Sequence, residues 1–89
     1  MEIHRRSSAG TMQSSDLMVV VEPSDTLRID IESMVKKQFE HLIRACVTST
    51  LEQLGVTRGH IRVSDRGALD YAIAARIEAA IRRASEPSS

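Results

Sequence analysis

The spacing of apolar residues between Val35 and Leu54 restricts the possible folds of this chain more than any other feature. Ser33, just before this segment, is of the type that caps helix N-termini, and Gly55 can take the left-handed conformation that ends a helix. The apolar residues recur at intervals of three and four, the period of one helix face: Val35, Phe39, Leu42, Ile43, Cys46, Val47, Thr50, Leu51 and Leu54. The sequence therefore predicts a long amphipathic helix that needs a second layer to bury its apolar face.

Three other segments have the composition of β-strands. Residues 17–21 form a largely β-branched run, and residues 27–31 and 60–64 alternate between apolar and polar side chains. Residues 8–12 can pair with residues 17–21, because Gln13-Ser14-Ser15-Asp16 between them is rich in side chains that form turns. The sequence therefore predicts a hairpin with Ser14 near its tip.

A second helical stripe closes the chain, after a turn at Asp65-Arg66-Gly67. Its apolar members are Leu69, Ile73, Ile77, Ala80 and Ile81. We expect a single α+β domain, with a small antiparallel or mixed sheet of about four strands and two helices packed on one face. This domain would span residues 9–84, between flexible ends at residues 1–8 and 85–89.

Composition excludes several classes of partner. Lys plus Arg is 12 and Asp plus Glu is 12, so no net charge attracts nucleic acid or an anionic membrane. Only Tyr71 and Phe39 could stack on bases, and no apolar run is long enough to span a bilayer. Cys46 is the single cysteine, and the first residues lack the apolar core of a signal peptide, so we expect a cytoplasmic protein.

Side chains with the potential for catalysis are scattered along the sequence. His4, His41 and His60 have no metal-binding spacing, so no metal site is predicted. Cys46 lies on the apolar stripe of the long helix, where a thiol behaves as a small hydrophobic group. The isolated glycines form no phosphate-binding loop, and we therefore expect no enzymatic activity of the chain's own.

The polar tip around Ser14 has two interpretations. An ordinary serine-rich turn explains it fully. An exposed hydroxyl on a rigid hairpin is also the geometry that a modifying transferase requires, because the oxygen must reach a phosphorus atom from the surface. Apolar periodicity does not distinguish these possibilities.

A resemblance to a known family rests on several separate segments. Residues 9–18, Ala-Gly-Thr-Met-Gln-Ser-Ser-Asp-Leu-Met, look like the segment that carries the prosthetic group in citrate lyase acyl carrier proteins (gamma subunits). The similarity continues, in the order and spacing of that family, through Val21-Glu22-Pro23 and residues 35–39, 65–70 and 75–79. The resemblance thus covers about residues 7–85.

The resemblance implies an attachment site and a cofactor. In that family a phosphodiester joins a serine hydroxyl to 2'-(5''-phosphoribosyl)-3'-dephospho-coenzyme A, and the residue that matches this serine is Ser14. Gln13 departs from the family, which often has Glu before the serine. Ser15 offers a neighbouring hydroxyl as an alternative.

The resemblance also implies how the carrier works. The thiol of the attached arm, not Cys46, would hold an acetyl group that is exchanged for citrate, and cleavage of the citryl thioester would release oxaloacetate. The partners would be the citrate lyase alpha subunit (acyl transferase), the beta subunit (citryl lyase) and a prosthetic-group transferase. The chain itself would be a non-catalytic subunit.

Other readings remain open at this point. The carrier (delta) subunit of malonate decarboxylase uses the same kind of group, although residues 9–16 and 65–70 favour citrate lyase. An unmodified protein-interaction module would share the fold. A four-helix carrier is disfavoured, because Ser15-Asp16-Leu17 reverses the Asp-Ser-Leu order and precedes a strand.

Overall fold

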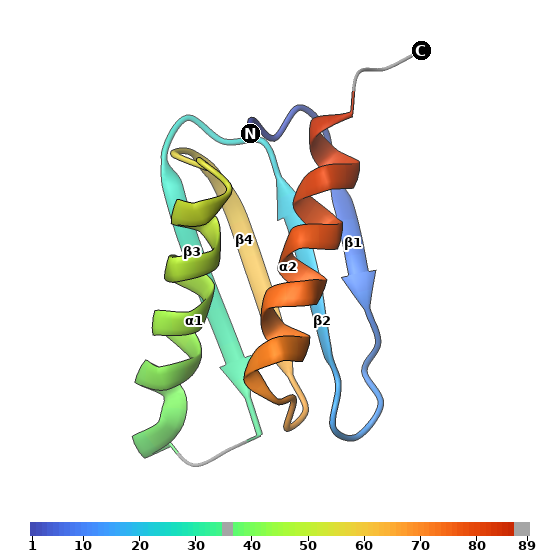
Figure 1. Cartoon of the computed structure of the whole chain (residues 1–89), viewed down its shortest axis with the longest axis vertical. Helices are drawn as coiled ribbons and strands as arrows, with labels where there is room; N and C mark the ends of the chain where they lie inside the picture. Colours follow the sequence, from blue (N-terminus) through green and yellow to red (C-terminus); the bar gives the residue numbers. More distant parts are fainter. Residues whose placement is uncertain (35–36, 87–89) are drawn as a thin grey trace.

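The computed structural model describes residues 1–34 and 37–86, which form one four-stranded sheet with two helices (Figure 1). The elements follow the order β1 (Ser7–Gly10), β2 (Leu17–Glu22), β3 (Leu27–Ser33), a 3-10 turn η1 (Lys37–Phe39), α1 (Glu40–Gln53), β4 (Gly59–Asp65) and α2 (Asp70–Ser85). In space the strands are ordered β1-β2-β4-β3. Only β3 and β4 run parallel, so the sheet is mixed and the predicted α+β class is confirmed.

The period of two in β2 decides which face of the sheet is buried. Leu17, Val19 and Val21 are completely buried, whereas the side chains between them are half-buried. Val19 stands opposite Ala9 of β1 on one side and Val63 of β4 on the other, and both partners are buried as well. These rows of apolar residues form the floor of the core.

Both helices cover this one face (Figure 1), as predicted. The helix α1 connects the parallel strands β3 and β4, which require a crossover of this kind, and α2 lies over β1 and β2. The buried side chains of α1 are Ile43, Val47, Thr50 and Leu51, and those of α2 are Ile73, Ile77, Ala80, Ile81 and Ala84.

The start of α1 differs from the prediction. Ser33 was expected as the N-cap, but it is the last residue of β3, and its hydroxyl donates a hydrogen bond to the Asp65 carboxylate at 2.8 Å. The N-cap of α1 is instead Phe39, which makes no capping hydrogen bond with its side chain. The expected first apolar position, Val35, lies outside the described residues, and the α-helix begins at Glu40.

The predicted role of Gly55 is confirmed. Its φ is 69°, and its amide donates to the Glu52 carbonyl while the Val56 amide donates to the Leu51 carbonyl. Leu51 and Val56 are both buried. This is a Schellman motif with its hydrophobic contact, and it ends α1 because only glycine takes this backbone conformation without a steric penalty.

The N-terminal segment, expected to be a flexible end over residues 1–8, contacts the core and the end of α2. Ile3 is buried in the core, the His4 amide donates to the Ala84 carbonyl at 2.9 Å, and Ser7 begins β1. An isolated apolar residue among polar ones gives no periodic signal, so the sequence pattern missed it. The mobility of this segment stays a prediction. At the other end Ser85 belongs to α2, and residues 87–89 lie outside the described residues.

Candidate functional site

Ser14 and Ser15 occupy the two central positions of the turn between β1 and β2. The turn is closed by the Asp16 amide, which donates to the Gln13 carbonyl at 3.2 Å. Ser15 has a φ of 65°, in the left-handed region, whereas Ser14 does not. These φ signs are those of a type II turn. Both serines are exposed, so Ser14 lies at the tip of a hairpin as the sequence predicts, while its modification stays a prediction.

The two serines differ in how they are held. The Ser15 amide donates to the Arg66 carbonyl at 2.8 Å, and the Arg66 amide donates back to the Asp16 carbonyl at 2.8 Å. This pair of bonds joins the turn to the loop that follows β4. Gly67 in that loop has a φ of 95°, in the left-handed region that favours glycine. Neither serine hydroxyl has a hydrogen-bond partner among the described residues, so the difference between the two residues lies in the backbone.

Asp16 fixes the base of the turn through its side chain. Its carboxylate accepts hydrogen bonds from the Thr11 hydroxyl at 2.6 Å and from the Leu17 amide at 2.8 Å. It also accepts two from the Arg76 guanidinium on α2, at 3.2 Å from Nε and 3.0 Å from Nη2. The bonds from Thr11, Leu17 and Arg76 lower the pKa of Asp16 from 3.8 to about 2. We refer to Thr11, Asp16 and Arg76 as the Asp16 cluster.

Gly10 makes room for this cluster. It has a φ of 95°, and a Cβ at this position would overlap the Leu17 carbonyl oxygen. The same Cβ would lie 3.3 Å from the Arg76 Cδ, so the guanidinium passes beside a residue that has no side chain. Glycine is therefore required at the point where β1 gives way to the turn.

Asp65 fixes the neighbouring loop in the same manner. It is 1% exposed, and its carboxylate accepts hydrogen bonds from the Ser33 hydroxyl at 2.8 Å and from the Ala68 amide at 2.9 Å. Its carbonyl accepts a bond from the Met34 amide at 3.3 Å. The end of β3 and the loop between β4 and α2 are thus tied together beside the Ser14 turn.

Sequence reasoning missed the Asp16 cluster. The sequence showed Asp16 only as a turn residue and Arg76 only as a polar position on a helix, and the two are 60 residues apart. The sole local signal was an aspartate directly after two serines, which a turn explains equally well.

Large apolar side chains are exposed around the same end of the molecule. Both helices begin where the β1–β2 loop lies (Figure 1). Among the described residues, eight large hydrophobic side chains are exposed, and six of them belong to loops or first helix turns at this end: Met12, Met34, Phe39, Leu42, Leu69 and Tyr71. We call these six residues the apolar rim.

Contacts between the helices show that part of the apolar rim shares one side. The Cys46 thiol lies 3.7 Å from the Asp70 carbonyl oxygen, so this side of α1 faces the start of α2. Leu42 is one helical turn before Cys46 and lies on the same side. Leu69 and Tyr71 flank Asp70. Exposed apolar residues of both helix starts therefore lie at the same end of the molecule as the Ser14 turn.

The other residues considered for chemistry do not come together at this end. Burial, and to a smaller extent the Asp70 carboxylate, raise the pKa of the Cys46 thiol, which disfavours the reactive thiolate. His4 and His41 are exposed, and His60 bonds the Asp30 carboxylate at 2.7 Å. In the described part of the chain, no three His, Cys, Asp or Glu side chains are grouped as metal ligands, and no helix is long and apolar enough to cross a membrane.

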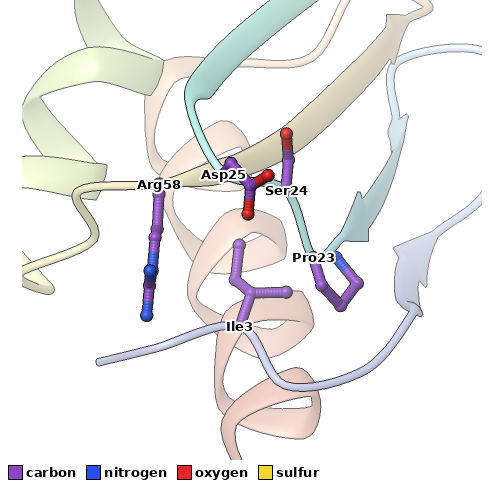
Figure 2. A pocket seen from close by; sticks show the side chains of 5 residues that line it. All are labelled: Ile3, Pro23, Ser24, Asp25 and Arg58. Atoms are coloured by element: carbon purple, nitrogen blue, oxygen red, sulfur yellow. The ribbon is translucent and has the colours of Figure 1, made fainter.

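A depression of about 520 Å³ lies at the opposite end of the sheet (Figure 2). Its lining is Ile3, Pro23, Ser24, Asp25 and Arg58. Arg58 is paired with Glu2 at 3.7 Å, and the lining contains no histidine or cysteine that could serve as a base or nucleophile. The depression is separate from the Ser14 turn, which lies at the other end of β2.

The family model and the curated relatives that match this chain all describe acyl carrier proteins. Residues 4–84 match the family model of the malonate decarboxylase delta subunit (MdcD), an acyl carrier protein family. The chain is 49% identical to the citrate lyase acyl carrier protein of Halothermothrix orenii, over 97% of this chain and 93% of that protein. It is 43% identical to the citrate lyase acyl carrier protein of Escherichia fergusonii, over 97% and 91% of the two chains.

A solved structure has the same fold. A chain in the crystal structure of a Pseudomonas malonate decarboxylase hetero-tetramer in complex with malonate superposes with a TM-score of 0.75, covering 93% of this chain and 87% of that one. The sequence identity is 21%, so this likeness concerns the fold. The family match and the curated relatives show that the chain belongs to one acyl carrier protein family, which includes the malonate decarboxylase delta subunit and the citrate lyase acyl carrier proteins and whose members are carriers and not catalysts.

Proposed function

We propose that this chain is the acyl carrier subunit of a citrate lyase and carries 2'-(5''-phosphoribosyl)-3'-dephospho-coenzyme A on Ser14 through a phosphodiester. The observation that carries the proposal is the exposed Ser14 hydroxyl at the tip of a turn whose neighbours are fixed by backbone and side-chain hydrogen bonds. Relatives that are 43% to 49% identical and named citrate lyase acyl carrier protein support the choice of complex.

The residues around Ser14 suit a covalently attached anionic group. Ser14 is exposed and its hydroxyl has no competing hydrogen bond among the described residues, and Arg76 already pairs with the Asp16 carboxylate at the base of the turn. The first turns of both helices, with their partial positive charge, are at this end of the fold (Figure 1). When bound, the group supplies a thiol that carries acyl units as thioesters.

The apolar rim supports an interaction with larger partners. Two ion pairs lie near the turn, Asp16 with Arg76 and Arg66 with Glu32, and the apolar rim is exposed at the same end of the molecule. Exposed apolar groups around an attachment point are typical of surfaces that contact proteins. We propose that the rim contacts the catalytic alpha and beta subunits when they receive the acyl arm, and contacts the prosthetic-group transferase during modification.

A second candidate is the delta subunit of a malonate decarboxylase. The family model and the hetero-tetramer structure favour it, since both bear that name. The curated relatives favour citrate lyase. Either role belongs in the cytoplasm, where the free Cys46 thiol is stable in its reduced form.

Intact mass spectrometry tests the attachment. Protein made together with its maturation enzymes should exceed the sequence mass by one prosthetic group, and Ser14→Ala should remove the whole increment. Ser15→Ala is the matched control, because it deletes the neighbouring hydroxyl and should keep the increment. A wild-type chain without added mass under these conditions, or an increment that disappears only in Ser15→Ala, would contradict the proposal.

Reconstitution separates the two complexes. The modified carrier should restore citrate cleavage when it is mixed with citrate lyase alpha and beta subunits, and should give no malonate decarboxylation with the subunits of that enzyme. The reverse result would assign the chain to malonate decarboxylase and leave the attachment at Ser14 intact.

A further inference from the structure

We propose that the Asp16 cluster determines which of the two adjacent serines is modified, by fixing the turn so that Ser14, and not Ser15, presents its hydroxyl to the transferase. This inference rests on the proposed function, because it concerns the selectivity of the same modification. Thr11, Asp16 and Arg76 would be positioning residues that do not touch the reacting atoms.

The sequence offers the transferase two chemically equal hydroxyls on neighbouring residues. The structure makes them unequal, since Ser15 has a φ of 65° and its amide is bound to the Arg66 carbonyl at 2.8 Å. Serine rarely takes this left-handed conformation, so the surrounding contacts must hold it there. If the turn were released, Ser15 could return to an ordinary conformation and its hydroxyl could take the place of the Ser14 hydroxyl.

Asp16 is the residue through which these contacts act. Its amide closes the turn on Gln13, its carbonyl accepts the Arg66 amide, and its carboxylate binds Thr11 and Arg76. The Thr11 hydroxyl in turn accepts the Gln13 amide at 3.3 Å. Because the Asp16 side chain is 17% exposed, these charge-assisted bonds are partly shielded from water and hold the turn more firmly than bonds on an open surface.

Arg76 has a second effect through its charge. In the modification the serine oxygen attacks a phosphorus of a nucleotide-derived phosphoanhydride. The new phosphoester bond forms, the anhydride bond breaks, the leaving phosphate takes its electron pair, and the serine proton passes to a base of the transferase. An unpaired Asp16 carboxylate beside the turn would repel this anionic reagent, and the two hydrogen bonds from Arg76 remove that repulsion.

The test combines transferase kinetics with mapping of the modified residue by peptide mass spectrometry. The wild type should be modified on Ser14 alone. Asp16→Asn, Thr11→Val and Arg76→Gln should be modified more slowly, on the order of 10- to 100-fold in kcat. Asp16→Asn and Arg76→Gln should also place a measurable share of the group on Ser15. Arg76→Lys should recover part of the rate, since lysine restores the charge but not the two parallel hydrogen bonds.

Arg82→Gln is the matched control. It breaks an exposed arginine–carboxylate pair of the same helix, Arg82 with Glu78 at 2.9 Å, and should change neither the rate nor the modified residue. A circular dichroism spectrum and a thermal unfolding curve identify variants that remain folded. If Asp16→Asn does not fold, Thr11→Val and Arg76→Gln still decide the question.

The failure of this inference is distinguishable from failure of the proposed function. Folded cluster variants that are modified at the wild-type rate and on Ser14 alone would overturn the role of the cluster. A wild-type chain that is never modified on Ser14 would overturn the proposed function as well. A slower rate on Ser14 that comes only from a higher KM would also count against positioning of the attacking oxygen.

Discussion

The two ends of the sheet are closed in opposite ways. At the Ser14 end, the loops are tied by polar contacts of Asp16 and Asp65, while the apolar rim remains exposed to solvent. At the opposite end, apolar Ile3 is buried against Gly59, where a Cβ would overlap the Ile3 side chain. The Ser14 end is therefore held by hydrogen bonds to carboxylates, and the opposite end is held by burial of an apolar side chain.

This difference shows how a small domain can keep apolar groups available to partners without losing its loop geometry. Burial of the apolar rim would stabilise the loops but would also remove the surface that a partner can contact. Hydrogen bonds to buried or half-buried carboxylates hold the loops in place without using that surface. The far end has no such requirement and is closed by the hydrophobic effect.

The largest expected effect is a loss of stability caused by a substitution at the far end, opposite the Ser14 turn. Ile3→Ala should lower the free energy of unfolding by about 2–4 kcal/mol, because it deletes most of a side chain that is 8% exposed. The rate and site of Ser14 modification should stay as in the wild type. Met34→Ala is the comparison at the Ser14 end, and it should change stability by less than about 0.5 kcal/mol. Chemical denaturation measures the free energy of unfolding of both variants, and equal losses of stability would remove the distinction between the two ends.

A smaller effect of opposite sign is expected from Leu69→Ser. Leu69 is the N-cap of α2, is 62% exposed, and makes no capping hydrogen bond with its side chain. Serine can cap the helix and should raise the free energy of unfolding by about 0.5–1 kcal/mol. Turnover of the reconstituted complex should nevertheless fall, because the apolar rim loses one of its members.

Leu27→Ser is the control for that experiment. Leu27 is 42% exposed at the start of β3, at the far end of the sheet. Its replacement should leave turnover unchanged. A stabilised Leu69→Ser variant with full turnover would show that exposure of the rim has no bearing on the partners.

The smallest expected effect is local and depends on pH. The folded state lowers the pKa of Asp16 to about 2, so the contribution of the Asp16 cluster to stability is complete above about pH 4 and is lost as the pH falls through about 2. The NMR signal of the Leu17 amide, which donates to the Asp16 carboxylate at 2.8 Å, should shift with that midpoint. The Val56 amide at the far end should not. The Leu17 transition should be absent in Asp16→Asn, and a midpoint near pH 4 in the wild type would contradict the cluster geometry.

Much of the fold could be predicted from local patterns. The alternation in residues 27–31 and 60–64 predicted β3 and β4, and the spacing of three and four residues predicted both helices. Gly55 correctly marked the end of α1, and the polar residues 13–16 marked the hairpin with Ser14 at its tip. Each of these features depends on residues close together in the chain, which explains why a single sequence reveals them.

Only the tertiary structure shows which distant segments of the chain contact one another. The strand order β1-β2-β4-β3, the parallel pairing of β3 with β4, and the contacts of Asp16 with Arg76 and of Ser33 with Asp65 join residues far apart in sequence. The sequence alone determined that the chain has strands, two helices and a serine-bearing turn, because periodicity and turn chemistry act over a few residues. Only the folded chain decided how the turn is held and which serine is restrained, because those interactions exist only when the sheet and α2 bring distant side chains within hydrogen-bonding distance.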